Sequence, residues 1–170
     1  MLGFLRRHLR SASSETKTNA YITMVRSNLE YCASAWNPHQ KKYEQKIEMV
    51  QHRAVRFTLN RYHNTSSVTS MLDQLSWETL KSRRIQLQLT NLYKIQHNLI
   101  DVEASKYLIK RSTTVRSKHS SQLNLYQPSP DQFKFSFFPR TIIHWNSLPV
   151  SVPEAPSLAQ FKKELSTQPF

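Results

Sequence analysis

Apolar residues recur at three- and four-residue steps along the first part of the chain, which is the spacing of one helix face. This pattern predicts a helix over residues 14–36, ending at Asn37-Pro38 because a residue before proline is disfavoured in the helical region. The pattern is clearest over residues 40–58, which predict a second helix. Its apolar face consists of Tyr43, Ile47, Val50, Ala54 and Phe57.

Two further helices are predicted before residue 100. A short one covers residues 67–75, and a long one runs from a cap at Ser76 to Leu99. The long helix carries Glu78 in its first turn, where the helix dipole favours negative charge.

The spacing of apolar residues changes after residue 100. Residues 111–121 are polar, basic and without periodicity, which predicts a loop. Apolar and polar residues then alternate in QLNLY (122–126) and FKFSF (133–137), on either side of the turn-forming QPSPDQ. This alternation predicts a β-hairpin. One face of the hairpin would carry Leu123, Leu125, Phe133, Phe135 and Phe137.

Two short helices complete the expected elements. Pro139 suits the first turn of a helix that passes through Trp145 and stops before Pro149. Ser157 and Gln160 form a capping box at the start of the last helix, which carries Leu158, Phe161 and Leu165. The crowded aromatic residues before and within the first of these helices are predicted to be core rather than a surface on which bases stack. The structural residues are Phe135, Phe138, Ile142 and Trp145.

These elements predict a mainly α protein with three regions. Residues 1–100 form a small helical bundle, and residues 101–121 a basic connector. Residues 122–170 form a small α+β region with one β-hairpin and short helices.

The charge of the chain bears on its partners. Lys and Arg number 24 against 11 Asp and Glu, which gives a formal net charge of +13. Such an excess attracts polyanions, and nucleic acid is the commonest of them. An anionic membrane surface or an acidic protein is the alternative that charge alone leaves open.

Several function classes are excluded or disfavoured by composition. The single glycine, Gly3, disfavours a glycine-rich loop that cradles a nucleotide phosphate. The single cysteine, Cys32, lies on an apolar stripe and is predicted to be a buried thiol. Scattered histidines and distant aspartates predict no catalytic group, no metal site and no cofactor.

The chain offers no obvious targeting or membrane segment. The apolar start is short and is interrupted by Arg6 and Arg7, so a signal peptide is not predicted. No apolar run approaches the ~20 residues of a membrane span. We therefore expect an intracellular protein, nuclear or cytoplasmic, with no membrane partner and no small-molecule substrate.

The positive functional signal is a line of cations on the helix predicted over residues 40–58. The basic ribbon consists of Lys42, Lys46, Arg53 and Arg56. These residues fall at i, i+4, i+11 and i+14, beside the apolar face, while Glu44 and Glu48 lie on the other flank. Separation of charge across one helix suits a phosphate backbone, although a solvated face has the same pattern. Further cations that could extend the surface are Arg83, Arg84, Arg116 and Lys118.

Three stretches resemble, in this order, the C-terminal part of reverse transcriptases of non-LTR retrotransposons. They are LGFLRRHLR, then LEYCASAWNPH followed by KIEMVQHRAVRF, and finally FSFFPRTIIHWNSLP. The likeness is to LINE elements of the jockey and CR1 kind, and it covers nearly the whole chain. The chain departs from the family at Ser27-Asn28, where the family carries a proline after the arginine, so we expect a looser helix turn there.

The resemblance implies that the helical part corresponds to the polymerase thumb, which grips the template–primer duplex, and the remainder to the region after it. The family's palm, with its catalytic aspartates, has no counterpart here. The resemblance thus implies a truncated, non-catalytic fragment whose partner is an RNA–DNA hybrid or structured RNA or DNA.

Two hypotheses follow. The first is a nucleic-acid-binding thumb fragment; the second is a retroelement fossil that acts only as a structural or protein-interaction module. Exposed aromatic residues beside the basic ribbon favour the first hypothesis, and acidic neighbours that neutralise the ribbon favour the second.

Overall fold

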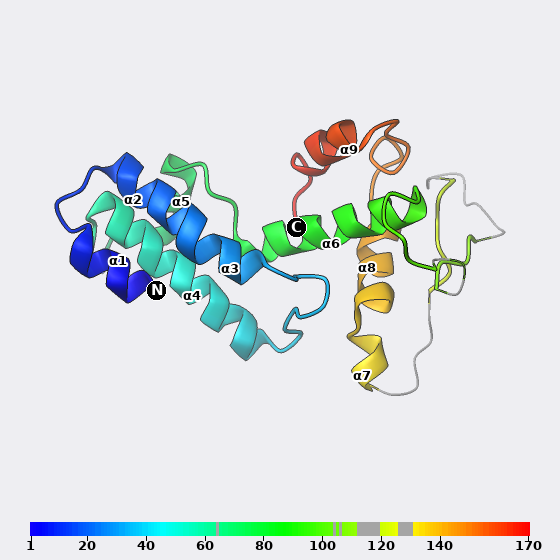
Figure 1. Cartoon of the computed structure of the whole chain (residues 1–170), viewed down its shortest axis with the longest axis horizontal. Coiled ribbons are helices and arrows are strands. Elements are labelled where there is room, and N and C mark those ends of the chain that lie inside the picture. Colours follow the sequence, from blue (N-terminus) through cyan, green and yellow to red (C-terminus); the bar gives the residue numbers. More distant parts are fainter. Residues whose placement is uncertain (64, 104, 106, 112–119, 126–130) are drawn as a thin grey trace. The chain divides into compact units, whose positions relative to one another are not determined.

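The protein is mainly α-helical, as the sequence predicts (Figure 1). A computed structural model describes residues 1–63, 65–103, 105, 107–111, 120–125 and 131–170. The chain forms two compact units, Met1–Arg83 and Arg84–Phe170. Within the described residues, no helix is long and apolar enough to cross a membrane.

The first unit begins with α1 (Leu2–His8) and a nearly continuous helical stretch. This stretch comprises α2 (Ser14–Tyr21), the π-helical turn η1 (Ile22–Arg26) and α3 (Ser27–Glu30). The wide π turn lies directly before Ser27. The stretch starts where the Ser13 hydroxyl accepts the backbone N–H of Thr16 at 3.2 Å.

The helix predicted over residues 14–36 ends earlier than expected, at Glu30. Cys32 adopts a positive φ of 50°, a left-handed backbone conformation that cannot continue an α-helix. Cys32 is also exposed, so the prediction of a buried thiol was wrong.

The predicted helix over residues 40–58 is confirmed as α4 (Lys41–Leu59), and the short helix that follows is α5 (Val68–Gln74), capped by Ser67. Helix α4 contacts α1, α2 and α5, which lie around it in Figure 1. Only the second half of its apolar face is buried. Ala54 and Phe57 are buried, whereas the Tyr43 side chain is 48% exposed.

The core of the first unit joins residues from α1, α2, η1, α4 and α5. Tyr21 of α2 is fully buried and stacks on Trp77 with 4.7 Å between ring centroids. The buried members are Leu5, Tyr21, Val25, Ala54, Val55, Phe57, Met71, Leu72 and Trp77.

The long helix is α6 (Leu80–Gln96), and it starts later than predicted. Ser76 does not cap it: Ser76 has a positive φ of 53° and ends the turn after α5. The Thr79 hydroxyl instead accepts the backbone N–H of Ser82 at 3.1 Å, and Glu78 lies outside the helix.

The division between the two units falls inside α6, between Arg83 and Arg84, and not near residue 100.

The predicted β-hairpin is absent from the described residues. Leu123 forms only an isolated antiparallel bridge with Lys110, and the FKFSF segment lies in α7 (Asp131–Lys134) and at the start of α8 (Phe137–Asn146). The Asn146 side-chain amide occupies the backbone groups that a partner strand would use. It accepts the Leu123 N–H at 3.0 Å and donates to the Leu123 carbonyl at 2.8 Å. Satisfied in this way, the backbone of Leu123 needs no second strand.

The core of the second unit is built around Trp145, as predicted. Trp145 and Ile142 are fully buried, and the Trp145 indole N–H donates to the Ser121 carbonyl at 3.0 Å. Phe138 is partly buried against this core, and its ring stacks on Tyr107 at 4.7 Å. Phe135 was predicted to be core, but this was wrong: it is partly exposed and does not belong to this cluster. The Lys134 ammonium lies 5.6 Å from its ring centroid.

Helices α6 and α9 (Leu158–Leu165) complete this second core. Ser157 caps α9 as predicted, since its hydroxyl accepts the Gln160 N–H at 3.2 Å. Tyr93 of α6 stacks on Phe161 of α9 at 4.3 Å and donates its hydroxyl to the Ala155 carbonyl at 2.8 Å.

Candidate nucleic-acid interface

The basic ribbon lies along α4, and most of it is open to solvent. Lys42, Lys46 and Arg53 are exposed, and Arg56 is partly exposed. No residue between positions 41 and 50 is buried, so the first half of α4 is accessible to solvent. The buried residues of the second half anchor the helix in the core. The ribbon therefore combines an accessible surface with a fixed backbone.

Among the described residues, no carboxylate pairs with the ribbon cations. None of the four forms an ion pair within the described part of the chain. Glu48, on the other flank of α4, accepts the backbone N–H of Lys81 at 2.7 Å, which directs its carboxylate toward the start of α6. The separation of charge predicted for this helix is thus retained after folding.

An aromatic groove lies beside the ribbon. It has a volume of about 540 Å³ and is lined by Ala35, Trp36, Asn37, Pro38, Tyr43, Lys46 and Ile47. The Trp36 side chain is 43% exposed, and its indole N–H donates to the Tyr31 carbonyl at 2.7 Å, which orients the ring. The Lys46 ammonium lies 5.5 Å from the Tyr43 ring centroid, so one residue belongs to both the ribbon and the groove.

Sequence reasoning missed this groove. Tyr43 has the helical spacing of a core residue, and Asn37-Pro38 signals only the end of a helix. The exposure of Tyr43 follows because the core of the first unit covers only the later turns of α4. The one available signal for the groove was that Trp36 lies close in sequence to the basic helix. Closeness in sequence does not reveal which aromatic rings are exposed.

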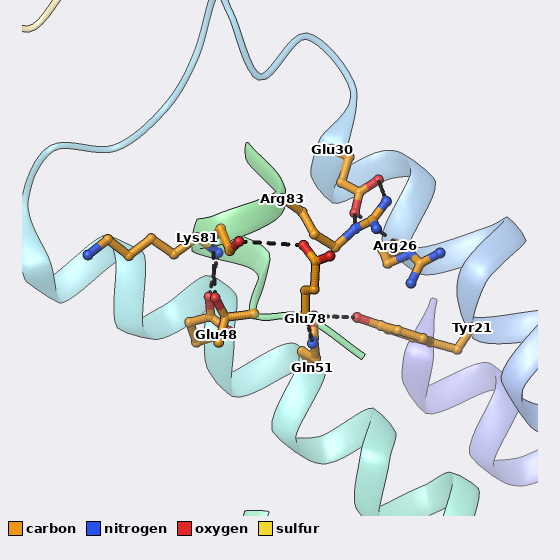
Figure 2. Close-up of polar contacts among 10 residues, drawn as sticks. Tyr21, Arg26, Glu30, Glu48, Gln51, Glu78, Lys81 and Arg83 are labelled. Carbon is orange, nitrogen blue, oxygen red and sulfur yellow. Dashed lines mark hydrogen bonds and ion pairs between the residues drawn. The ribbon is translucent and has the colours of Figure 1, made fainter. Parts of the chain in front are cut away.

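Arg83 does not extend the ribbon. Its Nε and Nη2 donate to the two carboxylate oxygens of Glu30, the second at 3.1 Å, as Figure 2 shows. The hydrogen bonds to Glu30 raise the pKa of the Arg83 guanidinium, against the effect of burial. The Nε of Arg26 also lies 3.7 Å from a carboxylate oxygen of Glu30. Burial of Arg26, together with the positive charge of Arg83, lowers the pKa of the Arg26 guanidinium.

Arg84 does not extend the ribbon either. Arg84 is buried, with 2% of its surface exposed, so it is not accessible to a phosphate backbone. Arg116 and Lys118 lie outside the described residues. Within the described residues, the candidate interface therefore comprises the ribbon on α4 and the groove formed with the segment that precedes it.

Within the residues that the structure describes, no group of three or more His, Cys, Asp or Glu side chains could hold a metal ion. The exposed Cys32 has Tyr31 beside it, and a hydrogen bond to the cysteine raises the pKa of the tyrosine hydroxyl.

Comparison with known proteins adds no relative to this picture. No protein-family model matches the chain, and neither the curated proteins nor the solved structures give a match.

Proposed function

We propose that the chain binds nucleic acid through the phosphate backbone, with the basic ribbon of α4 as its contact surface. In this proposal it is a non-catalytic fragment of a non-LTR retrotransposon reverse transcriptase, corresponding to the thumb and the region after it. The family part of the proposal is supported by the three resembling stretches alone.

One observation carries the binding proposal: four cations lie along one side of a well-anchored helix and have no acidic partner in the described residues. At 1.5 Å per residue, fourteen steps span about 21 Å, which matches several phosphates along one groove edge. Backbone contacts of this kind carry no sequence information. We therefore expect an RNA–DNA hybrid or structured RNA to bind with little dependence on sequence.

The groove beside the ribbon supports the same proposal. Exposed aromatic rings next to a cation suit the stacking of an unpaired base near the bound duplex. The groove also supports the second candidate, a protein-interaction module, because five of its seven lining residues are apolar or aromatic (Ala35, Trp36, Pro38, Tyr43, Ile47).

The deciding experiment measures binding of the full chain to an RNA–DNA hybrid over a range of salt concentrations. Replacing Lys42, Lys46, Arg53 and Arg56 with glutamine should flatten the slope of log K against log salt by about three to four units. The matched control replaces four exposed cations elsewhere, Lys81, Lys110, Lys162 and Lys163, and removes the same charge.

Two outcomes separate the candidates. A flatter slope in the ribbon variant, with a smaller change in the control, supports backbone binding by α4. An equal slope in both variants would mean that only net charge acts, and the protein-interaction module would then be the better proposal.

The absence of catalysis is tested separately. A chain without the palm's metal-binding aspartates should not extend a primer on an RNA template, with or without magnesium. Template-dependent incorporation by the purified chain, above a buffer control, would contradict this part of the proposal.

A further inference from the structure

A second basic site lies in the first unit and shares no residue with the basic ribbon. It is a pocket of about 450 Å³ lined by Gly3, Arg6, Arg7, Arg10 and Tyr62. The first four residues recur at three- and four-residue steps along α1 and its end, beside the apolar positions Leu2, Leu5 and Leu9 that pack on the core. Tyr62 comes from the segment after α4.

The lining of the pocket gathers positive charge, and its described residues include no carboxylate. Arg6, Arg7 and Arg10 are exposed, and none forms an ion pair within the described residues. Three guanidinium groups around one cavity repel one another, and a bound anion would relieve that repulsion. The guanidinium is also the cation whose planar fork matches the oxygens of a phosphate.

Tyr62 adds an aromatic wall to the pocket. Its side chain is 49% exposed, and the Arg6 guanidinium carbon lies 5.6 Å from its ring centroid. The cavity volume falls within the range of about 300–1,000 Å³ that is typical of small-ligand sites. A cationic wall facing an aromatic wall suits a ligand that has both an anionic and a flat part.

We propose that this pocket binds one nucleotide unit of an RNA or DNA strand, with its phosphate held by Arg6, Arg7 and Arg10 and its base stacked on Tyr62. The inference rests on the proposed function only in the class of ligand, because the ribbon takes no part in this site. The pocket would hold a strand end or an unpaired nucleotide, whereas the ribbon follows a duplex.

The test uses the full chain in the background of the four ribbon substitutions, so that binding reports the pocket. The probe is a trithymidylate with a 5′-phosphate. Its affinity for each variant is measured by isothermal titration calorimetry, and NMR of the arginine side-chain Nε–Hε signals locates the site in the protein that keeps the three arginines. We expect a saturable shift of the Arg6, Arg7 and Arg10 signals. Replacing the three arginines with glutamine should weaken binding about tenfold or more, the factor that corresponds to even one lost charge-assisted hydrogen bond.

Two further variants separate phosphate binding from general charge. Replacing the three arginines with lysine keeps the charge but removes the fork, and should also weaken binding. Tyr62→Leu should weaken binding of the trinucleotide and leave binding of inorganic phosphate unchanged. The control replaces Lys110, Lys162 and Lys163 with glutamine and should bind as the parent does. Circular dichroism of each variant checks that the helices are retained.

The inference is overturned if the arginine signals shift without saturation, or if the glutamine and control variants bind the probe equally well. Failure of the proposed function gives a different result. In that case the ribbon substitutions leave the salt dependence of hybrid binding unchanged, while the pocket still binds the trinucleotide.

Discussion

Arg83 in the first turn of α6 donates to both carboxylate oxygens of Glu30, the last residue of α3, across 53 residues of sequence (Figure 2). The two side chains are 29% and 14% exposed. The pair therefore fixes the start of α6 to the end of the helical stretch that begins at Ser14. An arginine that the sequence offers as a phosphate ligand is thus a structural residue of the first unit.

The pair should contribute measurably to stability. Arg83→Met or Glu30→Gln should each lower the free energy of unfolding by about 1–2 kcal/mol, because a bidentate, partly buried pair is worth more than an exposed one. A double-mutant cycle measured by urea unfolding gives the coupling energy. The matched cycle uses Arg26→Met, whose ion pair with Glu30 is longer at 3.7 Å and should show weaker coupling. Equal coupling in the two cycles would contradict the assigned role of Arg83.

Tyr21 predicts a loss of stability at alkaline pH. Burial raises the pKa of its hydroxyl above the ordinary value of about 10. The folded state therefore keeps this proton to higher pH than the unfolded state does. The resulting stabilisation is complete below about pH 10 and is lost as the pH rises further.

Tyr21→Phe isolates this effect, since phenylalanine does not titrate. The variant should show a shallower fall in unfolding free energy above about pH 10 than the parent protein. It also removes the 3.4 Å hydrogen bond to Gln51, which adds an offset at every pH but does not change the slope. Parallel curves for the two proteins would mean that Tyr21 titrates normally.

Asn60 should matter for two separate reasons. It ends α4 with a positive φ of 53°, and its Oδ1 accepts from the Nζ of the fully buried Lys17 at 2.9 Å. Asn60→Gly keeps the backbone conformation but leaves the buried ammonium without this acceptor, which should cost about 1–3 kcal/mol. Asn60→Ala should cost about 1 kcal/mol more, because alanine disfavours the left-handed region.

The contribution of Lys17 can be separated by a second substitution. In the Asn60→Gly background, Lys17→Met removes the buried ammonium that has lost its hydrogen-bond acceptor. The double variant should therefore recover part of the lost stability in thermal unfolding. If Lys17→Met destabilises this background as much as it does the parent protein, the two residues are not coupled.

Trp145 should be the most sensitive position of the second unit. Trp145→Ala should lower the unfolding free energy of this unit by about 3–5 kcal/mol, the range for a buried large aromatic residue. The control on the same helix is Ile143→Ala, since the Ile143 side chain is 59% exposed and its loss should be nearly neutral. Thermal melts in which both variants behave alike would contradict the central place of Trp145.

Local physics in the sequence determined much of the fold. Periodicity located α4 and α5, and the cap at Ser157 placed the start of α9, because these signals depend only on neighbouring residues. The burial of Ile142 and Trp145 was also predicted, since dense apolar residues have few places outside a core. The line of the ribbon on α4 follows from residue spacing alone.

Tertiary structure decided what depends on distant partners. The alternating segments around residue 123 did not pair as strands, because the amide of Asn146 satisfied the Leu123 backbone instead. Tyr43 has core spacing but is exposed, because the core of the first unit covers only the later turns of α4. Arg83 and Arg84 are adjacent and chemically identical, yet Glu30 holds the first while the second is buried. Residue spacing places a side chain on a helix face, but the elements that fold against that face decide whether it meets solvent, a carboxylate or the core.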